Sequence, residues 1–136
     1  MIAENTDPDY ISFQIDTFWA LRGGLDPVEL FRKYGKRVRL LHQKDFSKEI
    51  GEPINIFKFV DENKVIDYTT FSQVVKPESF TEIGTGTIDI QRIIDAAEKY
   101  TAAEYMVLEQ DFSKYDEIES INISMNSFKR FRGMEF

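Results

Sequence analysis

The feature that most constrains the fold is a repeated pattern in which a short apolar run ends on a side chain able to bind a metal ion. The runs occupy residues 11–16, 38–42 and 105–109, and their last members are Asp16, His42 and Glu109. Short apolar runs bounded by polar segments are typical of buried strands. Because the carboxyl ends of parallel strands meet at one rim of an α/β fold, these three side chains are expected to converge.

A helix is predicted after the first of these strands, beyond a flexible connection at residues 22–25. Asp26 suits its N-cap position, Pro27 suits its first helical position, and Glu29 completes a capping box. Gly35 provides the stop, and the second strand follows at once. The sequence therefore predicts a strand, a helix and a second strand in succession.

Two further helices are predicted in the second half of the chain. The first is capped by Asp89, and its apolar face consists of Ile90, Ile93, Ile94 and Ala97. The second is expected to be capped by Ser113, with an apolar stripe made of Ile118, Ile121, Met125 and Phe128. Steps of three and four residues place each set on one side of its helix.

Residues 43–79 form a long irregular connection, and such connections are usually functional or structured in their own right. We expect a small hairpin over the rim, built from residues 54–60 and 65–71 with 61–64 as its turn. A further strand is predicted at residues 80–83. Alternation of strands and helices then predicts an α/β fold with a parallel sheet of four strands.

Composition sets the class of protein. A chain of 136 residues with 42% hydrophobic content is long enough for one domain with a real core. The absence of cysteine excludes disulfides, thiolate metal sites and cysteine nucleophiles. A formal net charge of −7 works against non-specific binding to nucleic acid. Without a bilayer-length apolar run or a signal-peptide pattern, a cytoplasmic location is expected.

Four motifs follow one another in order along the chain, at residues 14–27, 41–45, 82–89 and 107–111. Together they resemble those of the xylose-isomerase-like TIM barrels, the sugar phosphate isomerases and epimerases whose superfamily includes endonuclease IV. The resemblance implies that residues 1–136 are a single domain, the C-terminal half of a (βα)8 TIM barrel, equivalent to its parallel strands 5–8 with covering helices. Self-association is then expected to complete the barrel.

The resemblance also implies a site. Asp16, His42 and Glu109 would bind a divalent metal ion, such as manganese, magnesium, cobalt or zinc. Carboxylate and imidazole ligands favour such hard-to-borderline cations over copper(I). The family's usual fourth ligand, a glutamate on the preceding strand, would lie before Met1. Glu109 is the expected catalytic residue, moving a proton to and from the substrate.

Other residues are candidates for substrate contact or for orienting the ligands. Trp19 stands where several epimerases of the family have a histidine. Lys44 would contact a substrate oxygen or phosphate, or else pair with Asp45 at the rim; Asp45 would otherwise orient the ligands. Asp111 is expected beside the ligands rather than among them. All four follow a predicted strand within a few residues.

The segment after residue 80 offers two further alternatives. Gly84 and Gly86 could form a phosphate-binding loop, although a tight turn into the next helix fits two glycines better. Glu82 could supply a missing carboxylate to the barrel, or could be an ion-paired core residue.

The leading function is a sugar or sugar-phosphate isomerase or epimerase that works through an enediolate. The alternative is a truncated remnant that binds a metal or a sugar without turnover. Endonuclease IV-like cleavage is disfavoured, because the single histidine of the chain cannot build a histidine-rich trinuclear zinc cluster. The expected partners are a small sugar or sugar phosphate and either a second copy, forming a homodimer, or a complementary half-barrel chain.

The self-association rests on exposed apolar side chains. Half a barrel leaves two open edges and leaves its inward residues facing water. The inward residues are expected to include Phe13, Ile15, Leu40, Val107 and Ile83.

Overall fold

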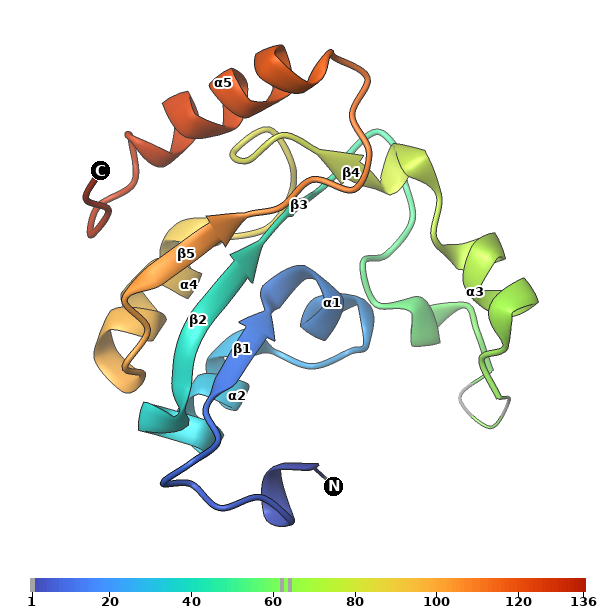
Figure 1. The fold of residues 1–136 in the computed structure, drawn as a ribbon. Coiled ribbons are helices and arrows are strands. Elements are labelled where there is room, and N and C mark those ends of the chain that lie inside the picture. Colours follow the sequence, from blue (N-terminus) through green and yellow to red (C-terminus); the bar gives the residue numbers. More distant parts are fainter. Residues whose placement is uncertain (1, 62, 64) are drawn as a thin grey trace.

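A three-stranded parallel sheet forms the centre of the computed structural model, which describes residues 2–61, 63 and 65–136 (Figure 1). Its strands are β1 (Phe13–Asp16), β2 (Val38–Gln43) and β5 (Tyr105–Leu108), in the order β1-β2-β5. Both neighbouring pairs are parallel. The α/β class with a parallel sheet is therefore confirmed.

Helices and short elements connect these strands. The α-helices are α1 (Thr17–Arg22), α2 (Pro27–Tyr34), α3 (Tyr68–Val74), α4 (Ile90–Tyr100) and α5 (Glu117–Phe128). Single 3-10 turns occur at Ile2–Glu4, Gly35–Arg37, Ile56–Lys58 and Pro77–Ser79. Two more strands, β3 (Asp45–Phe46) and β4 (Phe80–Thr81), pair antiparallel with each other.

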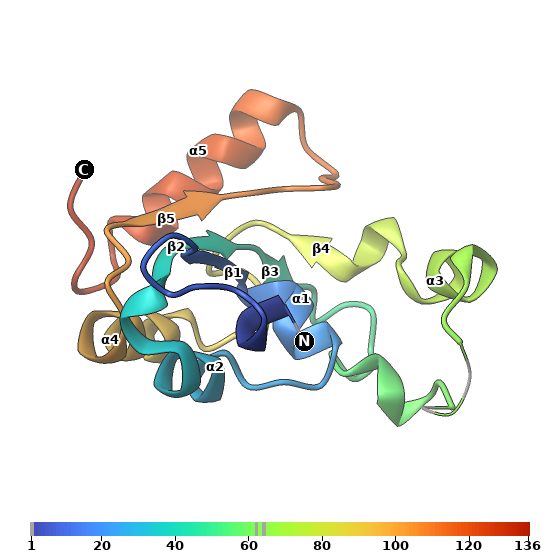
Figure 2. The same cartoon turned by 60° about the horizontal axis from the view of Figure 1, so that its bottom comes forward.

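One face of the parallel sheet is covered by α2 and α4, which lie behind the strands in Figure 1 and below them in Figure 2. Ile15, Leu41 and Met106 form one row across the three strands and pack toward these helices. Because side chains alternate along a strand, the next row, which contains Asp16 and His42, points to the opposite face. The metal-ligand candidates are therefore on the face without α2 and α4.

Both helices that cover the sheet begin where the sequence predicts. The Asp26 carboxylate accepts a hydrogen bond from Val28 N at 3.0 Å, and Asp89 caps α4 in the same way. Gly35 ends α2 with a φ of 52°, a left-handed conformation that favours glycine. The Glu29 carboxylate accepts from Arg32 on its own helix, so the predicted capping box is replaced by an ion pair.

The prediction of a flexible connection at residues 22–25 is wrong at its first residue. Arg22 ends α1 and is only 2% exposed. Its guanidinium donates to Ile54 O at 3.1 Å and to Val74 O, and lies over the Phe46 ring. Arg22 thus anchors the long connection 43–79 to the body of the domain.

The prediction of a fourth parallel strand at residues 80–83 is also wrong. β4 pairs with β3, and β2 pairs directly with β5. The part of the chain that the structure describes therefore has three parallel strands rather than four. Only three of the four strands predicted to be equivalent to barrel strands 5–8 are therefore in the parallel sheet.

In the described residues of the long connection, 43–61, 63 and 65–79, the predicted hairpin is not found. Its two apolar segments contain the 3-10 turn at Ile56–Lys58 and most of α3 instead. Of the predicted turn, Glu62 and Lys64 lie outside the described residues. α3 lies away from the parallel sheet in both views (Figures 1 and 2).

α5 differs from its prediction in both its cap and its buried face. Asp116, not Ser113, caps the helix by accepting from Ile118 N and Glu119 N. The predicted stripe is half wrong, because Ile118 is 69% exposed and Ile121 is 47% exposed. The buried face holds three small residues and one aromatic one, namely Ser120, Ser124, Ser127 and Phe128.

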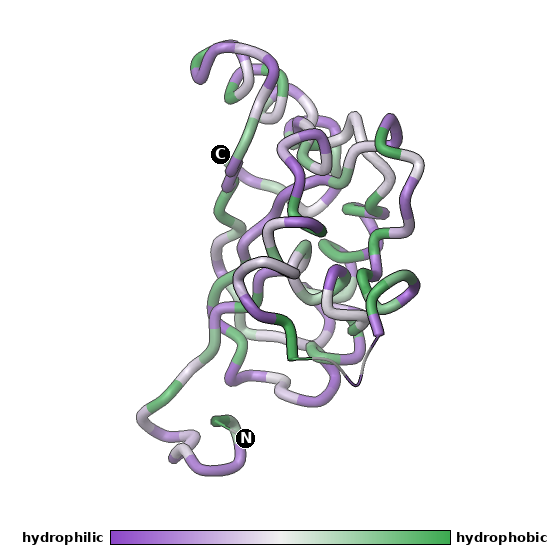
Figure 3. The backbone as a smooth tube through the Cα atoms, turned by 90° about the vertical axis from the view of Figure 1, so that its right-hand side faces the viewer, coloured by the Kyte–Doolittle hydropathy of each residue, from purple (hydrophilic) through white to green (hydrophobic). Residues whose placement is uncertain are grey.

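The apolar segments of the chain are short. Hydrophobic and hydrophilic stretches succeed one another along the tube in Figure 3. Among the described residues, none of the helices combines the length and the apolar character needed to cross a membrane.

Candidate metal centre

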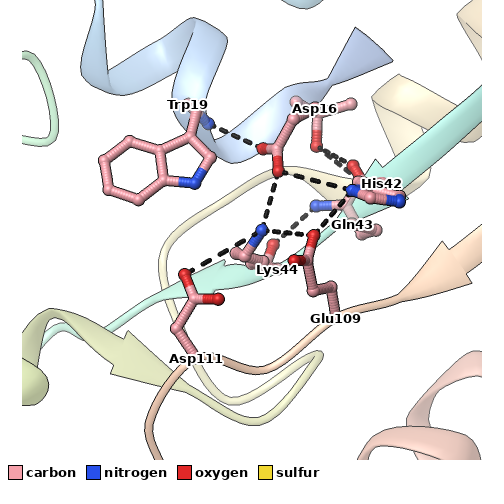
Figure 4. A network of polar contacts seen from close by, with 8 residues as sticks. Asp16, Trp19, His42, Gln43, Lys44, Glu109 and Asp111 are labelled. Carbon is pink, nitrogen blue, oxygen red and sulfur yellow. Dashed lines mark hydrogen bonds and ion pairs between the residues drawn. The ribbon is translucent and has the colours of Figure 1, made fainter. Parts of the chain in front are cut away.

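The structure brings Asp16, His42 and Glu109 together at the carboxyl ends of the parallel strands (Figure 4). Each offers one ligand atom, and these atoms all lie within 4.8 Å of one another. His42 Nδ1 is 2.6 Å from Glu109 Oε2 and 3.8 Å from Asp16 Oδ2. The predicted convergence of the three side chains is therefore present.

Backbone register and capping place these groups. Asp16 and His42 are direct neighbours across β1 and β2, and Glu109 N donates to Gln43 O at 3.2 Å just beyond β5. Asp16 is also the N-cap of α1, because its Oδ1 accepts from Trp19 N at 2.8 Å. That bond leaves the other carboxylate oxygen, Oδ2, directed into the cluster.

Lys44 lies at the centre of the cluster and is 1% exposed. Its Nζ is 2.7 Å from Asp16 Oδ2, 2.7 Å from Glu109 Oε2 and 4.0 Å from Asp111 Oδ2. Lys44 follows His42 by two residues, so the alternation of an extended chain directs both side chains to the same face. The predicted position of Lys44 near the site is met, but its ion pairs go to the candidate ligands rather than to Asp45.

The charges in the cluster shift one another's pKa values. Hydrogen bonding from Lys44 lowers the pKa of Glu109, which therefore carries its negative charge at neutral pH. Burial acts to lower the pKa of Lys44, but hydrogen bonds to Asp16 and Glu109 outweigh it, and the net shift is upward. Burial raises the pKa of Asp111.

The residues present fit a divalent cation by their donors and their charge. Two carboxylates and one imidazole suit manganese, magnesium, cobalt or zinc. With His42 neutral, as a metal ligand must be, the three ionised carboxylates face one ammonium, and this leaves two negative charges in the cluster uncompensated. Because uncompensated like charges repel, a doubly charged cation at this place would be electrostatically favoured.

Asp45 does not orient the candidate ligands. It follows Lys44 by one residue, and its carboxylate is bound to backbone N–H groups of its own neighbour and of the loop 84–88. The donors are Phe46 N at 2.8 Å and Ile88 N at 3.1 Å to Oδ1, with Gly84 N and Gly86 N both at 2.9 Å to Oδ2. Gly84 has a φ of 81°. The two glycines thus form a turn around a buried carboxylate, in line with the turn that the sequence favours over a phosphate loop.

Trp19 stands beside the site on α1. Its backbone N–H binds Asp16, and its ring stacks on Phe71 at a centroid distance of 5.9 Å. The rings of Trp19 and Phe80 also meet, and Phe112 packs on Phe80. Trp19 therefore joins Asp16 to an aromatic cluster whose Phe80 belongs to the buried core.

Two supporting residues were not predicted from the sequence. Thr17 and Gln43 are fully buried, and the Thr17 hydroxyl donates to Gln43 Oε1 at 2.9 Å. Gln43 Nε2 in turn donates to Lys44 O at 2.6 Å. The position of Gln43 could have indicated this pair, because Gln43 is a polar residue on the helix-facing side of β2. Such a residue requires a buried hydrogen-bond partner.

Glu82 does not supply a carboxylate to the cluster. It is 2% exposed and accepts hydrogen bonds from the Ser113 and Ser120 hydroxyls. Glu82 is thus a core residue, as the second alternative predicts. Within the described part of the chain, however, its partners are hydroxyl groups, and the ion pair that this alternative includes is not found.

Comparison with known proteins gives partial matches to inosose dehydratases. No protein-family model matches the chain. It is 30% identical over 116 residues to an inosose dehydratase of Lacticaseibacillus casei, covering 84% of this chain and 36% of that protein. An inosose dehydratase of Clostridium tetani is 29% identical over 120 residues, covering 87% and 37%, respectively. One from Geobacillus kaustophilus is 34% identical over 88 residues, covering 65% and 25%.

The chain thus spans about a third of the length of the curated relatives that it matches most fully. The parallel sheet, the cluster of Asp16, His42 and Glu109, and these partial matches agree with one another. The chain is distantly similar to part of the inosose dehydratases.

Proposed function

We propose that this chain is the metal-binding part of an enzyme that removes a proton next to the carbonyl of a polyhydroxy ketone. The observation that carries the proposal is the convergence of Asp16, His42 and Glu109 around Lys44 at one rim of the parallel sheet. The three side chains would hold the divalent cation, with manganese, magnesium, cobalt or zinc as the chemical choices.

Isomerisation and dehydration of such substrates share their first step. An inosose is a cyclic polyhydroxy ketone, and a dehydratase eliminates water from it. Both reactions begin with loss of the proton on the carbon beside the carbonyl. A bound divalent cation would polarise that carbonyl and stabilise the negative charge that develops on its oxygen. The similarity to inosose dehydratases favours elimination of water as the second step, with sugar isomerisation or epimerisation as the alternative.

The chain's own residues supply distinct parts of this chemistry. Glu109, whose pKa is lowered, is ionised and would accept the proton. Lys44 would stabilise negative charge on a substrate oxygen from its buried position. The Trp19 ring, which stands beside Asp16 on α1, would pack against the C–H faces of the substrate ring.

A second candidate is a binding module without turnover. It is favoured by the ion pairs of the buried Lys44 ammonium, which engage the carboxylates of both Asp16 and Glu109. The two candidates share the metal-binding cluster and differ in catalysis alone. An activity measurement therefore separates them.

We further propose that additional parallel strands cover the open face of the sheet. β1 and β5 are the edge strands in the described structure, and Tyr105 on the open face is 70% exposed. Leu40 and Val107 also point to this face, as predicted, whereas Ile15 packs toward α2 and α4 and Ile83 is fully buried against α4 and α5. Phe13 packs edge-on against Tyr34 of α2, so it is not inward either.

The number of strands argues against closure of a barrel by two copies alone. Each copy offers three parallel strands, so two copies supply six, whereas a (βα)8 barrel needs eight. The predicted closure of a barrel by two copies relied on four strands each. A longer (βα) segment that brings the remaining strands and a ligating carboxylate fits the open edges better.

The first prediction concerns cation binding and turnover. Trp19 is the single tryptophan of the chain, and its backbone N–H donates a hydrogen bond to Asp16. Because Trp19 is therefore close to the cluster, Mn²⁺ bound there is expected to quench its fluorescence saturably. Mg²⁺ and Zn²⁺ should compete with Mn²⁺ for that effect.

The Mn²⁺-loaded protein should release water from an inosose, detected as the ultraviolet absorbance of the conjugated ketone, and Glu109→Gln should abolish this turnover.

The outcomes of this experiment separate the proposals. No saturable quenching by Mn²⁺ would refute the metal site. Quenching without turnover of inososes, ketoses or ketose phosphates would favour the binding module.

The second prediction concerns assembly. Sedimentation at micromolar concentration should show self-association or capture of a complementary (βα) chain, because the open face exposes apolar side chains of which each large one is worth about 1.5–3 kcal/mol when fully buried. A stable monomer that does not bind such a chain would contradict the covered-face proposal. A stable homodimer would show that a second copy takes this place.

A further inference from the structure

A buried carboxylate outside the metal cluster holds the segment that carries two of the site's acidic residues. Glu82 Oε1 accepts from the Ser113 hydroxyl at 2.6 Å and from the Ser120 hydroxyl at 3.0 Å. Ser113 belongs to the connection between β5 and α5, and Ser120 belongs to α5. Glu82 therefore ties the connection to the helix that follows it.

The connection is short and is held at both ends. At its start, Glu109 N donates to Gln43 O, which fixes it to β2. Four residues later Ser113 is bound to Glu82, and between them the Phe112 ring packs on Phe80 at 5.6 Å. Asp111 thus lies between two anchors, Glu109 at the sheet and Ser113 at Glu82.

We propose that Glu82 is a positioning residue for the metal cluster. Through Ser113 it fixes the connection that carries Glu109 and Asp111, and so sets where their carboxylates stand relative to Lys44. This role rests on the proposed function, since it concerns the same site. Hydrogen bonds to a carboxylate are charge-assisted and stronger than those between neutral groups, which suits an anchor.

Neighbouring contacts of α5 provide a matched comparison. The Ser124 hydroxyl accepts from Ile83 N at 3.1 Å, and Ser127 packs against Gly84. Both contacts hold α5 to the segment around Glu82, but neither reaches the connection at residues 110–113. Loss of Ser124 should therefore loosen the helix without moving Glu109.

The test compares Ser113→Ala with Ser124→Ala by Mn²⁺ titration of the full chain, read from Trp19 fluorescence. Ser113→Ala removes one of the two hydroxyl donors of the buried Glu82 carboxylate, so it should lower the melting temperature and also weaken Mn²⁺ binding on the order of fivefold. Ser124→Ala should lower the melting temperature as well, but with parental affinity for Mn²⁺. Glu82→Gln keeps an oxygen acceptor and should bind Mn²⁺ more tightly than Glu82→Ala.

A metal-free readout keeps this inference separate from the proposed function. His42 is the single histidine, and its Nδ1 contacts Glu109, so its imidazole NMR resonances report the position of Glu109. They should shift in Ser113→Ala and stay parental in Ser124→Ala. If the parent binds no Mn²⁺, the proposed function fails, and these resonances still decide the positioning role. Parental His42 resonances in Ser113→Ala would overturn that role.

Discussion

His42→Ala is expected to abolish most of the binding of divalent cations. The chain has one histidine, so no other imidazole can replace the lost ligand. Removing the partners that merely orient metal ligands costs 10–100-fold in affinity in characterised sites, so loss of a ligand itself should cost about 100-fold or more. Mn²⁺ titration followed by the fluorescence of Trp19 measures the loss, and added imidazole should restore part of the affinity.

Gln14→Ala is the matched control for this variant. Gln14 is exposed and points to the same open face of the sheet, two residues before Asp16, but offers no ligand to the cluster. Its variant should bind Mn²⁺ with parental affinity. Parental affinity in His42→Ala as well would mean that the cation binds elsewhere, and would remove the assignment of Asp16, His42 and Glu109.

Gly86→Ala is expected to have the largest effect on stability. A Cβ at this position would lie 2.3 Å from Asp45 Oδ1 and 2.4 Å from Phe46 O, far inside contact distance. The clash must displace the loop 84–88 from the Asp45 carboxylate and break backbone bonds to a charged acceptor, each worth about 1.5–3 kcal/mol. The free energy of unfolding should fall by about 3 kcal/mol or more, as measured by urea denaturation followed by circular dichroism.

Gly51→Ala controls for the general cost of replacing a glycine. Gly51 has a φ of 65°, but nothing lies within 4 Å of a Cβ built there. Its variant should lose only about 1–2 kcal/mol, the cost of a left-handed conformation for alanine. Equal losses in the two variants would show that the Asp45 contacts do not stabilise the loop.

Local patterns were sufficient for the strands that carry the site and for the helices that cover them. Asp26 and Asp89 cap helices where predicted, because N-capping depends on a side chain and the backbone two or three residues away. The convergence of Asp16, His42 and Glu109 followed from parallel strands alone, since such strands end at one rim.

Contacts between distant segments were not predictable in the same way. The strand at residues 80–83 was placed in the parallel sheet, but its pairing with β3 depends on which edge lies nearby in space. Three of the four buried residues of α5 are serines rather than members of the predicted apolar stripe. The helix approaches Gly84 so closely that a Cβ there would lie 2.9 Å from Ser127 Cβ, and only small side chains fit such a gap.

The sequence by itself determined which side chains stand at the ends of the parallel strands, because apolar periodicity and helix caps act within a few residues. Tertiary structure alone decided which partners the neighbours of His42 bind: Lys44 pairs with Asp16 and Glu109, whereas Asp45 binds the loop 84–88. It also decided that Glu82 binds Ser113 and Ser120, 31 and 38 residues away. A buried polar group must find its partner wherever the fold brings one, and sequence proximity does not reveal which partner that is.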